Sequence, residues 1–255
     1  MRVLRQSSLH PLSLPPENLA NLEISGLWRR GKLVVFDLKD HAQGEAAPTT
    51  MVIHLRMTGA LLPYPKNSAP AKHTRCIFDV LNANGNPLHL FFDDIRTFGK
   101  ILIANSLILE KWSFWQNLGP EPLEIGHSAF RKRLAGNKIL KSALLDQTVI
   151  AGIGNIYADE ALFQAGLNPM RKSNSLNDRE CQNLLSALKD VLTRSIEQCG
   201  SSIRDYKDAN GKAGAFQNSF QVYGKGGEKC PRCRGILQKT RVGGRGTVFC
   251  PHCQQ

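Results

Sequence analysis

Short runs of β-branched and aromatic residues dominate the chain between residues 27 and 103, and turn-forming residues separate them. Runs of this kind are typical of strands, and connections rich in Gly, Pro and Asn are typical of turns. The pattern therefore predicts an antiparallel β domain, either a sandwich or a barrel. The predicted strands contain KLVVFDL, TTMVIHLRM, TRCIFDVL and PLHLFF, and the predicted turns contain AQGEAAPTT, PYPKNSAPAK and NANGNP.

After Trp112 the hydrophobic pattern changes, and apolar residues recur three and four positions apart. This is the spacing of one face of an α-helix, so a helical region follows the β domain. The last predicted helix starts at a capping signal in residues 175–178 and ends at Gly200, and a polar loop fills residues 201–223. The predicted helices contain HSAFRKRLAG, KILKSALLDQ, NIYADEALFQAG and DRECQNLLSALKDVLTRSIEQCG.

Near its C-terminus the chain carries two Cys-x-x-Cys pairs, Cys230 with Cys233 and Cys250 with Cys253. Each pair offers two thiolates from one tight turn, and four thiolates in a tetrahedron are typical ligands of zinc. We expect one structural Zn²⁺, because four cysteines leave no position open for water. Metal binding would fix a hairpin that is too small to fold alone. A redox pair is the alternative.

The bulk composition narrows the class of protein and of partner. At 255 residues the chain is long enough for two domains, and Lys+Arg 33 against Asp+Glu 21 gives a net charge of +12, which favours a polyanionic partner. The chain shows neither a secretory signal nor an apolar run long enough to span a membrane. Seven cysteines, four of them in metal-ligand spacing, indicate a reducing compartment, so we expect a cytoplasmic protein. The other three read as small hydrophobic residues: Cys76, Cys181 and Cys199.

Two glycine-containing motifs could approach a phosphate. Gly152 and Gly154 lie between two predicted helices, and Asn155 opens the second helix, whose N-terminal N–H groups can hold an anion. The glycines follow a helix and a third glycine is missing, so a helix-turn-helix on a DNA backbone fits better than a dinucleotide site. Arg245 stands between glycines on the stretch that joins the cysteine pairs, where a phosphate can come close. A glycine-tightened helix corner and a solvated arginine remain the alternatives.

A third group of candidate residues is spread over the β domain. Taken singly, a lysine that opens a strand is usually solvated, and a methionine or phenylalanine is usually part of the core. Together, a lysine, a wedge residue and a basic-aromatic pair suit a protein that enters a duplex and displaces a base. The group consists of Lys32, Met57, His73, Arg96 and Phe98.

From about residue 27 to its end, the chain resembles the formamidopyrimidine-DNA glycosylases, in the family that includes endonuclease VIII. LGPEPL and the loop that ends in GAFQ favour the formamidopyrimidine branch. The resemblance implies an α+β multidomain fold with DNA in a cleft: a truncated β-sandwich (1–110), a helix-two-turn-helix domain with a lesion-recognition loop (111–220) and a zinc-ribbon finger (221–255). The residues that carry it are HLRMTG, LGPEPL, KSALLDQTVIAGIGNIYADEALFQAG, SSIRDYKDANGKAGAFQ, QVYGKGGEKCPRC and TVFCPHC.

This resemblance implies a bifunctional enzyme of base excision repair. It would remove oxidised purines, such as formamidopyrimidines and 8-oxoguanine, and then nick the abasic site by β,δ-elimination. In such enzymes an amine attacks C1′, expels the base and forms a Schiff base, whose cation acidifies the 2′ proton. The partner would be double-stranded DNA with oxidised bases or abasic sites, bound by a monomer in the bacterial cytoplasm at the nucleoid.

The resemblance also assigns roles to individual residues. Lys32 matches a lysine credited with proton transfer in β-elimination and with phosphate contact. Arg245 matches the ribbon arginine that contacts phosphates at the lesion and assists δ-elimination. Three residues match those that fill the space of the everted base: Met57, Arg96 and Phe98. Contacts to the DNA backbone are implied for His73, Lys141 and Asn155, and a loop that covers the flipped base for Ser201, Ser202 and Tyr206.

The start of the chain departs from the family pattern. The family begins with a proline that supplies the nucleophilic amine, followed by a glutamate, whereas this chain begins MRVLRQSS. Either the true start lies upstream or the protein lacks its nucleophile, and the presence of Lys32 and Arg245 favours the first explanation. If the chain is complete, we expect an open sheet edge with exposed apolar surface, and DNA binding without base excision. Ile95 and Thr97 are smaller departures.

Rival functions of other classes stay open at this point. A catalytically silent protein that recognises damaged or bent DNA would use the same cleft and explain the same basic residues. A zinc-ribbon protein that binds RNA or the ribosome would explain the charge and the cysteines. It would leave GIGNIYADEALF and LGPEPL without a purpose.

Overall fold

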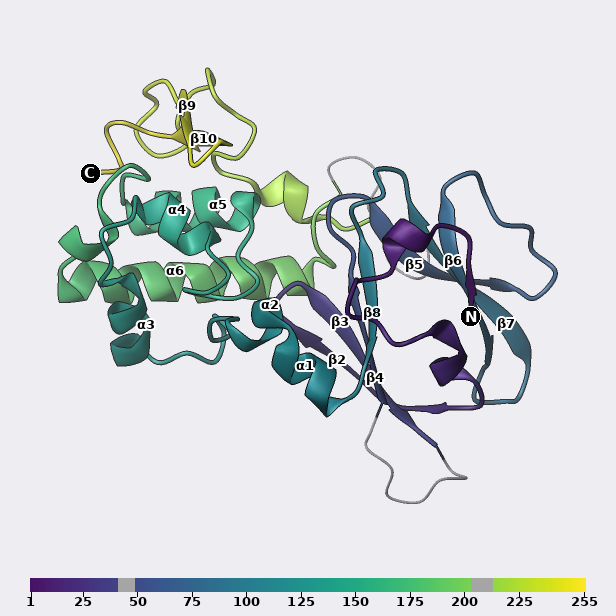
Figure 1. Cartoon of the computed structure of the whole chain (residues 1–255). Helices are drawn as coiled ribbons and strands as arrows, with labels where there is room; N and C mark the ends of the chain where they lie inside the picture. Colours follow the sequence, from purple (N-terminus) through teal and green to yellow (C-terminus); the bar gives the residue numbers. More distant parts are fainter. Residues whose placement is uncertain (41–48, 203–212) are drawn as a thin grey trace. The chain divides into compact units, whose positions relative to one another are not determined.

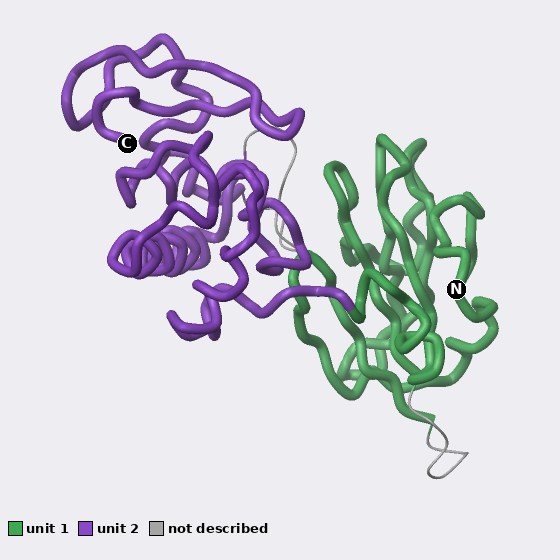
Figure 2. The backbone as a smooth tube through the Cα atoms, turned by 60° about the vertical axis from the view of Figure 1, so that its left-hand side comes forward, with its two compact units in different colours: residues 1–116, 205–212 green, residues 117–204, 213–255 purple. Residues whose placement is uncertain are grey.

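The computed structural model describes residues 1–40, 49–202 and 213–255, and the chain divides into two compact units (Figures 1 and 2). Among the described residues, unit 1 is 1–116, and unit 2 contains 117–202 with 213–255. Each unit has a hydrophobic core of its own. No helix in the described part of the chain is long and apolar enough to cross a membrane.

Unit 1 is a sandwich of two antiparallel four-stranded sheets, in the orders β1-β6-β7-β5 and β2-β3-β4-β8. Phe36 and Ile53 from the second sheet and Phe78 and Phe92 from the first belong to one buried cluster, so the core lies between the sheets. The predicted β-sandwich is therefore confirmed. The strands are β1 (Arg2–Val3), β2 (Glu23–Arg30), β3 (Leu33–Lys39), β4 (Thr49–His54), β5 (Gly59–Pro65), β6 (Thr74–Leu81), β7 (Pro87–Asp94) and β8 (Lys100–Ala104).

The boundaries of two strands differ from the prediction. Strand β2 starts before residue 27, and β5 includes Pro63 and Pro65, where the sequence predicts a turn. In the part of the chain that the structure describes, β5 is the edge of its sheet and pairs only with β7. An edge strand tolerates proline, because one side of its backbone needs no N–H for a neighbour.

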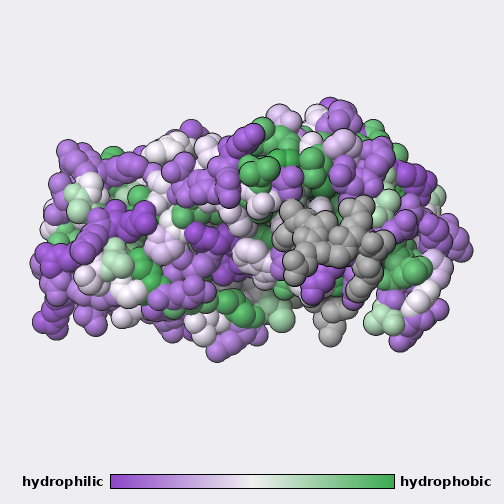
Figure 3. Space-filling model, turned by 60° about the horizontal axis from the view of Figure 1, so that its bottom comes forward, coloured by the Kyte–Doolittle hydropathy of each residue, from purple (hydrophilic) through white to green (hydrophobic). Residues whose placement is uncertain are grey.

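The other sheet ends in an edge strand with apolar surface. Ile24, Leu27 and Trp28 of β2 expose 45%, 64% and 43% of their surface. The face of the molecule in Figure 3 is mostly hydrophilic, with hydrophobic residues in separate groups. The opposite edge strand, β8, leads into α1 (Ser106–Lys111) and α2 (Ser113–Gln116). Two short 3-10 helices precede β2: η1 (Gln6–Ser8) and η2 (Pro16–Leu19).

Unit 2 is helical, with a small two-stranded hairpin at its end. The four predicted helices are present, and their apolar faces form one buried cluster. Asn177 caps α6 in a reciprocal capping box with Glu180, and Gly166, in the left-handed conformation at φ +73°, ends α5. The elements are α3 (His127–Leu134), α4 (Leu140–Leu145), α5 (Asn155–Ala165), η3 (Ser173–Ser175), α6 (Asp178–Glu197), η4 (Phe216–Ser219), β9 (Gln238–Val242) and β10 (Arg245–Phe249).

The three cysteines outside the pairs behave differently from one another. Cys76 lies in the sandwich core and Cys181 in the helical core, as expected of small hydrophobic residues. Cys199 is exposed and has φ +57°, just after the end of α6. The prediction is wrong for Cys199, because the chain turns sharply there and leaves the side chain outside the core.

Candidate nucleic-acid interface

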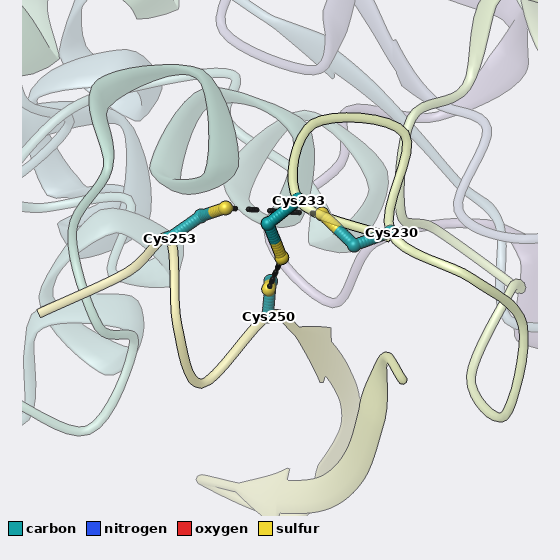
Figure 4. A group of neighbouring side chains, drawn as sticks. All are labelled: Cys230, Cys233, Cys250 and Cys253. Carbon is teal, nitrogen blue, oxygen red and sulfur yellow. Dashed lines mark hydrogen bonds between the residues drawn. The ribbon is translucent and has the colours of Figure 1, made fainter. Parts of the chain in front are cut away.

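The four predicted zinc ligands lie together in the ribbon (Figure 4). Their Sγ atoms are all within 4.8 Å of one another, with Cys230 to Cys253 at 3.9 Å and Cys233 to Cys250 at 3.5 Å. In a tetrahedral site with zinc–sulfur distances of about 2.3 Å, the sulfur atoms lie about 3.8 Å apart. The cysteines are therefore positioned to bind one zinc ion, as the sequence predicts.

The zinc ribbon presents Arg245 at a tight hairpin turn. Strands β9 and β10 are joined by Gly243 and Gly244, at φ +56° and +74°. Two consecutive positive φ angles are typical of a type I′ turn, which glycine adopts without strain. A Cβ atom on Gly243 would come within 2.9 Å of Ser142 Oγ, so the turn packs closely on α4. Arg245, the first residue of β10, is exposed.

Lys141 lies beneath this turn, and its position differs from the expected contact to a DNA backbone. Its side chain has no exposed surface, and Nζ lies 2.6 Å from Oδ1 of the equally buried Asp159. Nζ also donates to the Gly246 carbonyl at 2.9 Å and to Thr247 Oγ1 at 2.8 Å. Burial lowers the pKa of Lys141 and raises that of Asp159 to about 6, while the contact between them offsets both shifts. Three protein oxygen atoms therefore lie within 3 Å of Nζ.

Asn155 reaches the same turn from the N-terminus of α5. Its Nδ2 donates to the Gly246 carbonyl at 3.0 Å. The N-cap residue, Gly154, has no side chain that could occupy the N–H groups of the first turn. Gln147, which the sequence analysis missed, fixes the approach to the helix, because its amide donates to the Ile153 carbonyl and accepts from Gly152 N–H. The expected glycine-opened helix N-terminus and the arginine turn therefore lie side by side.

The ribbon is docked along the rest of α5. Arg232, between the first two zinc ligands, donates to the carbonyls of Phe163 and Gln164 at 3.0 and 3.1 Å and stacks on the Phe163 ring at 4.4 Å. A cation at this end of a helix interacts favourably with its dipole. Glu160 accepts three backbone N–H groups from residues 221–223, which lead into the ribbon. The position of the arginine turn relative to α5 is thus fixed at several points.

In unit 1, three predicted residues form one exposed group, which we call the wedge cluster: Met57, Arg96 and Phe98. Met57 comes from the β4–β5 loop, and the other two come from the β7–β8 loop. Arg96 donates to Met57 Sδ at 3.1 Å, and its guanidinium lies 4.7 Å from the centre of the Phe98 ring. Met57 and Phe98 expose 65% and 50% of their surface. Single exposed apolar side chains are common, but here two of them stand together with an arginine on neighbouring loops, so the cluster is a candidate for insertion into a duplex.

A buried carboxylate that the sequence analysis did not single out holds both loops of the wedge cluster. Asp94 is 1% exposed, and its Oδ1 accepts from Thr58 Oγ1 at 2.5 Å and from Arg96 N–H at 3.2 Å. Its Oδ2 accepts from Gly99 N–H at 2.7 Å. One side chain therefore fixes the backbone at both ends of the β7–β8 loop and joins it to the β4–β5 loop.

Lys32 and His73 lie on other turns of unit 1. Lys32 is exposed in the two-residue turn between β2 and β3, and it does not begin the strand. Burial, together with the positive charges of Arg56 and Lys32, lowers the pKa of His54 to about 4. His73 is half-buried, and its carbonyl accepts from the backbone N–H of Asp94. It therefore adjoins the carboxylate that orders the wedge cluster.

The predicted lesion loop is described only at its two ends. Ser202 Oγ accepts from Gly214 N–H at 2.8 Å, and Ser202 N–H donates to Gln217 Oε1 at 2.9 Å. Ser201 Oγ is buried and has no hydrogen-bond partner among the described residues. Tyr206 lies outside the described residues. Hydrogen bonds therefore join the two described ends of the loop.

Family models match three successive parts of the chain. The formamidopyrimidine-DNA glycosylase N-terminal domain matches residues 2–101, and the H2TH domain of the same glycosylases matches residues 118–207. The zinc finger found in FPG and IleRS matches residues 227–255. The chain belongs to the formamidopyrimidine-DNA glycosylase family. The expected family and fold are therefore confirmed.

Relatives from bacteria agree with this membership. A formamidopyrimidine-DNA glycosylase of Nitratidesulfovibrio vulgaris is 48% identical over 80% of this chain, and the match spans 55% of the relative's length. One from Carboxydothermus hydrogenoformans is 45% identical over 91% of this chain and 81% of its own length.

Solved structures of family members have the same fold. The Thermus thermophilus MutM structure has a TM-score of 0.79 at 38% identity, over 91% of this chain and 83% of its own. A Lactococcus lactis FPG variant in complex with a Fapy-dG containing DNA has a TM-score of 0.85 at 32% identity, over 100% of this chain and 90% of its own.

Proposed function

We propose that this chain is a bifunctional DNA glycosylase and abasic-site lyase of base excision repair. It removes oxidised purines, formamidopyrimidines and 8-oxoguanine among them, and cuts the abasic strand by β,δ-elimination. Family members have been solved with DNA that contains carbocyclic 8-oxo-G, Fapy-dG or an abasic site, which supports this substrate class. The observation that carries the proposal is the wedge cluster, because an enzyme that acts on an everted base must fill the space that the base leaves.

Two cations have catalytic roles in this proposal. Lys32, exposed at its hairpin turn, takes part in proton transfer during β-elimination and contacts a phosphate. Arg245 contacts the phosphates at the lesion and assists δ-elimination. Its exposure at a zinc-fixed turn beside the N-terminus of α5 supports this role, because guanidinium and helix N–H groups both bind phosphate.

The remaining predicted residues bind and orient the DNA. Met57, Arg96 and Phe98 occupy the stack after base eversion, and His73 and Asn155 approach the DNA backbone. The segment that contains Ser201, Ser202 and Tyr206 covers the everted base, and the laced ends of the loop support this role. Zinc, when bound, supplies only structural order, since four thiolates complete its coordination.

We propose the same division of the chain as the sequence predicts, with domains at 1–110, 111–220 and 221–255. The three family matches support these boundaries. The protein would act as a monomer on duplex DNA in the bacterial cytoplasm, at the nucleoid.

Borohydride trapping on duplexes with 8-oxoguanine or an abasic site tests the reaction. An imine between enzyme and C1′ is reduced to a stable covalent complex, and peptide mass mapping then locates the attacking amine. The protein should be made from its own gene and its N-terminus sequenced, because the family's attacking amine is that of an N-terminal proline. We expect a trapped complex, and strand cleavage that leaves phosphates at both ends of the gap.

A result without cleavage or a trapped complex, but with tight binding to an abasic-analogue duplex, would establish the catalytically silent alternative. Arg245→Ala is the internal control. It should reduce the δ-elimination product more than the β-elimination product.

A further inference from the structure

Lys141 is a cation that the proposed chemistry does not use. Its ammonium group is enclosed and engages Asp159, the Gly246 carbonyl and Thr247 Oγ1, at 2.6, 2.9 and 2.8 Å. Burying a lysine requires a partner charge and hydrogen bonds for its remaining protons, and these three acceptors supply both. A phosphate could replace none of them unless the hairpin turn moved.

Two of these acceptors belong to the residues that follow Arg245 directly. Gly246 also receives the Asn155 amide, so α4 and α5 both hold one carbonyl of the turn. Gly246 has no side chain to fix its orientation, and it follows a turn of two further glycines. A backbone with so many accessible conformations needs external contacts to keep one of them. Lys141 and Asn155 provide these contacts.

Lys141 also affects Arg245 electrostatically, because it neutralises the nearby charge of Asp159. Arg245 is close enough that its charge contributes to lowering the pKa of Lys141, after the larger effect of burial. Asp159 lies next to the same ammonium group. With Lys141 present, the Asp159 carboxylate is neutralised by an internal cation. Without it, the carboxylate would attract the guanidinium of Arg245 inward, away from the surface.

We propose that Lys141 is a positioning residue for Arg245, and that the Lys141–Asp159 pair holds the arginine turn in the orientation that grips a phosphate. This inference rests on the proposed function, in which Arg245 contacts phosphates at the lesion. It replaces the direct phosphate contact that the family resemblance implies for Lys141.

The test uses a charge-neutral pair of substitutions, Lys141→Met with Asp159→Asn. Lys141→Met alone would leave a buried carboxylate unpaired and could prevent folding. In the paired variant no charge remains beneath the turn, and the amide oxygen that replaces the carboxylate can still accept from Val248 N–H, as Asp159 does. The matched control is Lys138→Met with Asp146→Asn, which removes an ion pair of the same unit between an exposed lysine and a half-buried aspartate, with no bond to the hairpin among the described residues.

Affinity for an abasic-analogue duplex is measured between 50 and 200 mM salt for the wild type, the neutral pair, Arg245→Ala and the combined triple variant. If Arg245 makes one phosphate contact, its removal lowers affinity by about ten-fold and reduces the slope of log K against log salt by about 0.9. We expect the neutral pair to match Arg245→Ala within about two-fold, the triple variant to be no weaker than either, and the control pair to bind like the wild type.

Each other outcome identifies what has failed. Additive losses, with a slope change of about 1.8 in the triple variant, would show that Lys141 contacts phosphate itself and overturn the positioning role. Wild-type affinity of the neutral pair, beside a weakened Arg245→Ala, would overturn it as well. An Arg245→Ala variant that binds like the wild type would refute the proposed function of Arg245.

A spectroscopic readout separates positioning from a loss of fold. Zinc content of one per chain and unchanged amide resonances in the α6 helix would show that the neutral pair is folded. We expect shifted or broadened amide signals confined to the hairpin turn and a displaced Arg245 Nε signal. Identical hairpin spectra in the neutral pair and the wild type would refute the positioning role.

Discussion

Replacing Asp94 with asparagine tests whether one buried carboxylate holds the wedge cluster in place. The carboxylate accepts from Thr58 Oγ1, Arg96 N–H and Gly99 N–H at 2.5, 3.2 and 2.7 Å, and it is 1% exposed. Asparagine has nearly the same shape but carries one acceptor oxygen and one NH₂ group. The NH₂ group of the asparagine must therefore face a group that is itself a hydrogen-bond donor.

The magnitude follows from the partners that lose their acceptor. If the amide oxygen of the substituted side chain stays near Thr58 and Arg96, its NH₂ group faces Gly99 N–H, and a buried donor left unpaired costs about 1–3 kcal/mol. The two remaining bonds also weaken, because a neutral acceptor bonds about half as strongly as a charged one. The backbone at Gly99 packs closely on the Phe92 ring, since a Cβ atom on Gly99 would lie 2.5 Å from that ring. The loop therefore has little room to move away from the substituted side chain. We expect the free energy of unfolding to fall by about 2–4 kcal/mol.

Urea denaturation and DNA binding together measure the effect. Asp94→Asn should lower the denaturation midpoint and weaken binding to an abasic-analogue duplex by about ten-fold, or about 1.4 kcal/mol, because Arg96 and Phe98 lose their fixed backbone. Asp93→Asn is the matched control, since its Oδ1 accepts from Thr74 Oγ1 and an amide oxygen can do the same. If both variants share one midpoint and one affinity, Asp94 does not order the wedge cluster.

Three further results are expected. Removing zinc with a strong chelator should release one ion per chain and lower DNA affinity at least about ten-fold in a gel-shift assay, while unit 1 keeps its circular dichroism, because Arg245 lies on the ribbon. NMR titration should give His54 a pKa of about 4, and Lys32→Met should raise that pKa. The folded-state pKa lies below the 6.5 of an unfolded histidine. The stability that neutral His54 contributes above pH 6.5 should therefore be lost as the pH falls toward 4. The hydrogen-bonded guanidinium of Arg171 lowers the pKa of Glu180 below its usual 4.5. Glu180→Gln should therefore cost about 1–2 kcal/mol by thermal unfolding at about pH 7, and this difference should shrink as the pH falls below 4.5 through the lowered pKa.

The sequence predicted the zinc site completely, because its geometry is local. Each Cys-x-x-Cys pair brings two sulfurs together within one turn, and the pairs need only a hairpin to meet. The helices were predictable for the same reason, since their apolar spacing repeats within a few residues. Strand β5 was not, because its prolines are tolerated only at a sheet edge, and the order of strands is a property of the whole sheet.

The buried side chains that hold the candidate site, Asp94 and Lys141, could not be predicted from the sequence, because their hydrogen-bond partners are distant along the chain. Asp94 bonds to Thr58, 36 positions away, and a carboxylate after a strand reads as solvated when nothing shows what covers it. Lys141 was expected to contact a DNA backbone, because the family resemblance implies this contact. Its acceptor Gly246 lies 105 positions further on and encloses it only when the ribbon docks. The hydrophobic pattern of a single segment therefore could not have shown that Asp94 or Lys141 is buried.

In both units a buried carboxylate holds the turn that carries an exposed arginine. A substitution can therefore weaken DNA binding either by removing the arginine or by releasing its turn. In unit 1, the backbone of the exposed Arg96 donates directly to the buried carboxylate of Asp94. In unit 2, the turn of the exposed Arg245 is held by Lys141, which pairs with the buried carboxylate of Asp159. Removing Arg245, which the proposed function places on phosphates, takes away a phosphate contact, so both affinity and its dependence on salt should fall. Removing Asp94 takes away no cation, so any wedge contact to bases should be lost with an unchanged salt slope. A reduced slope in Asp94→Asn would mean that Arg96 binds a phosphate and does not fill the space of a base.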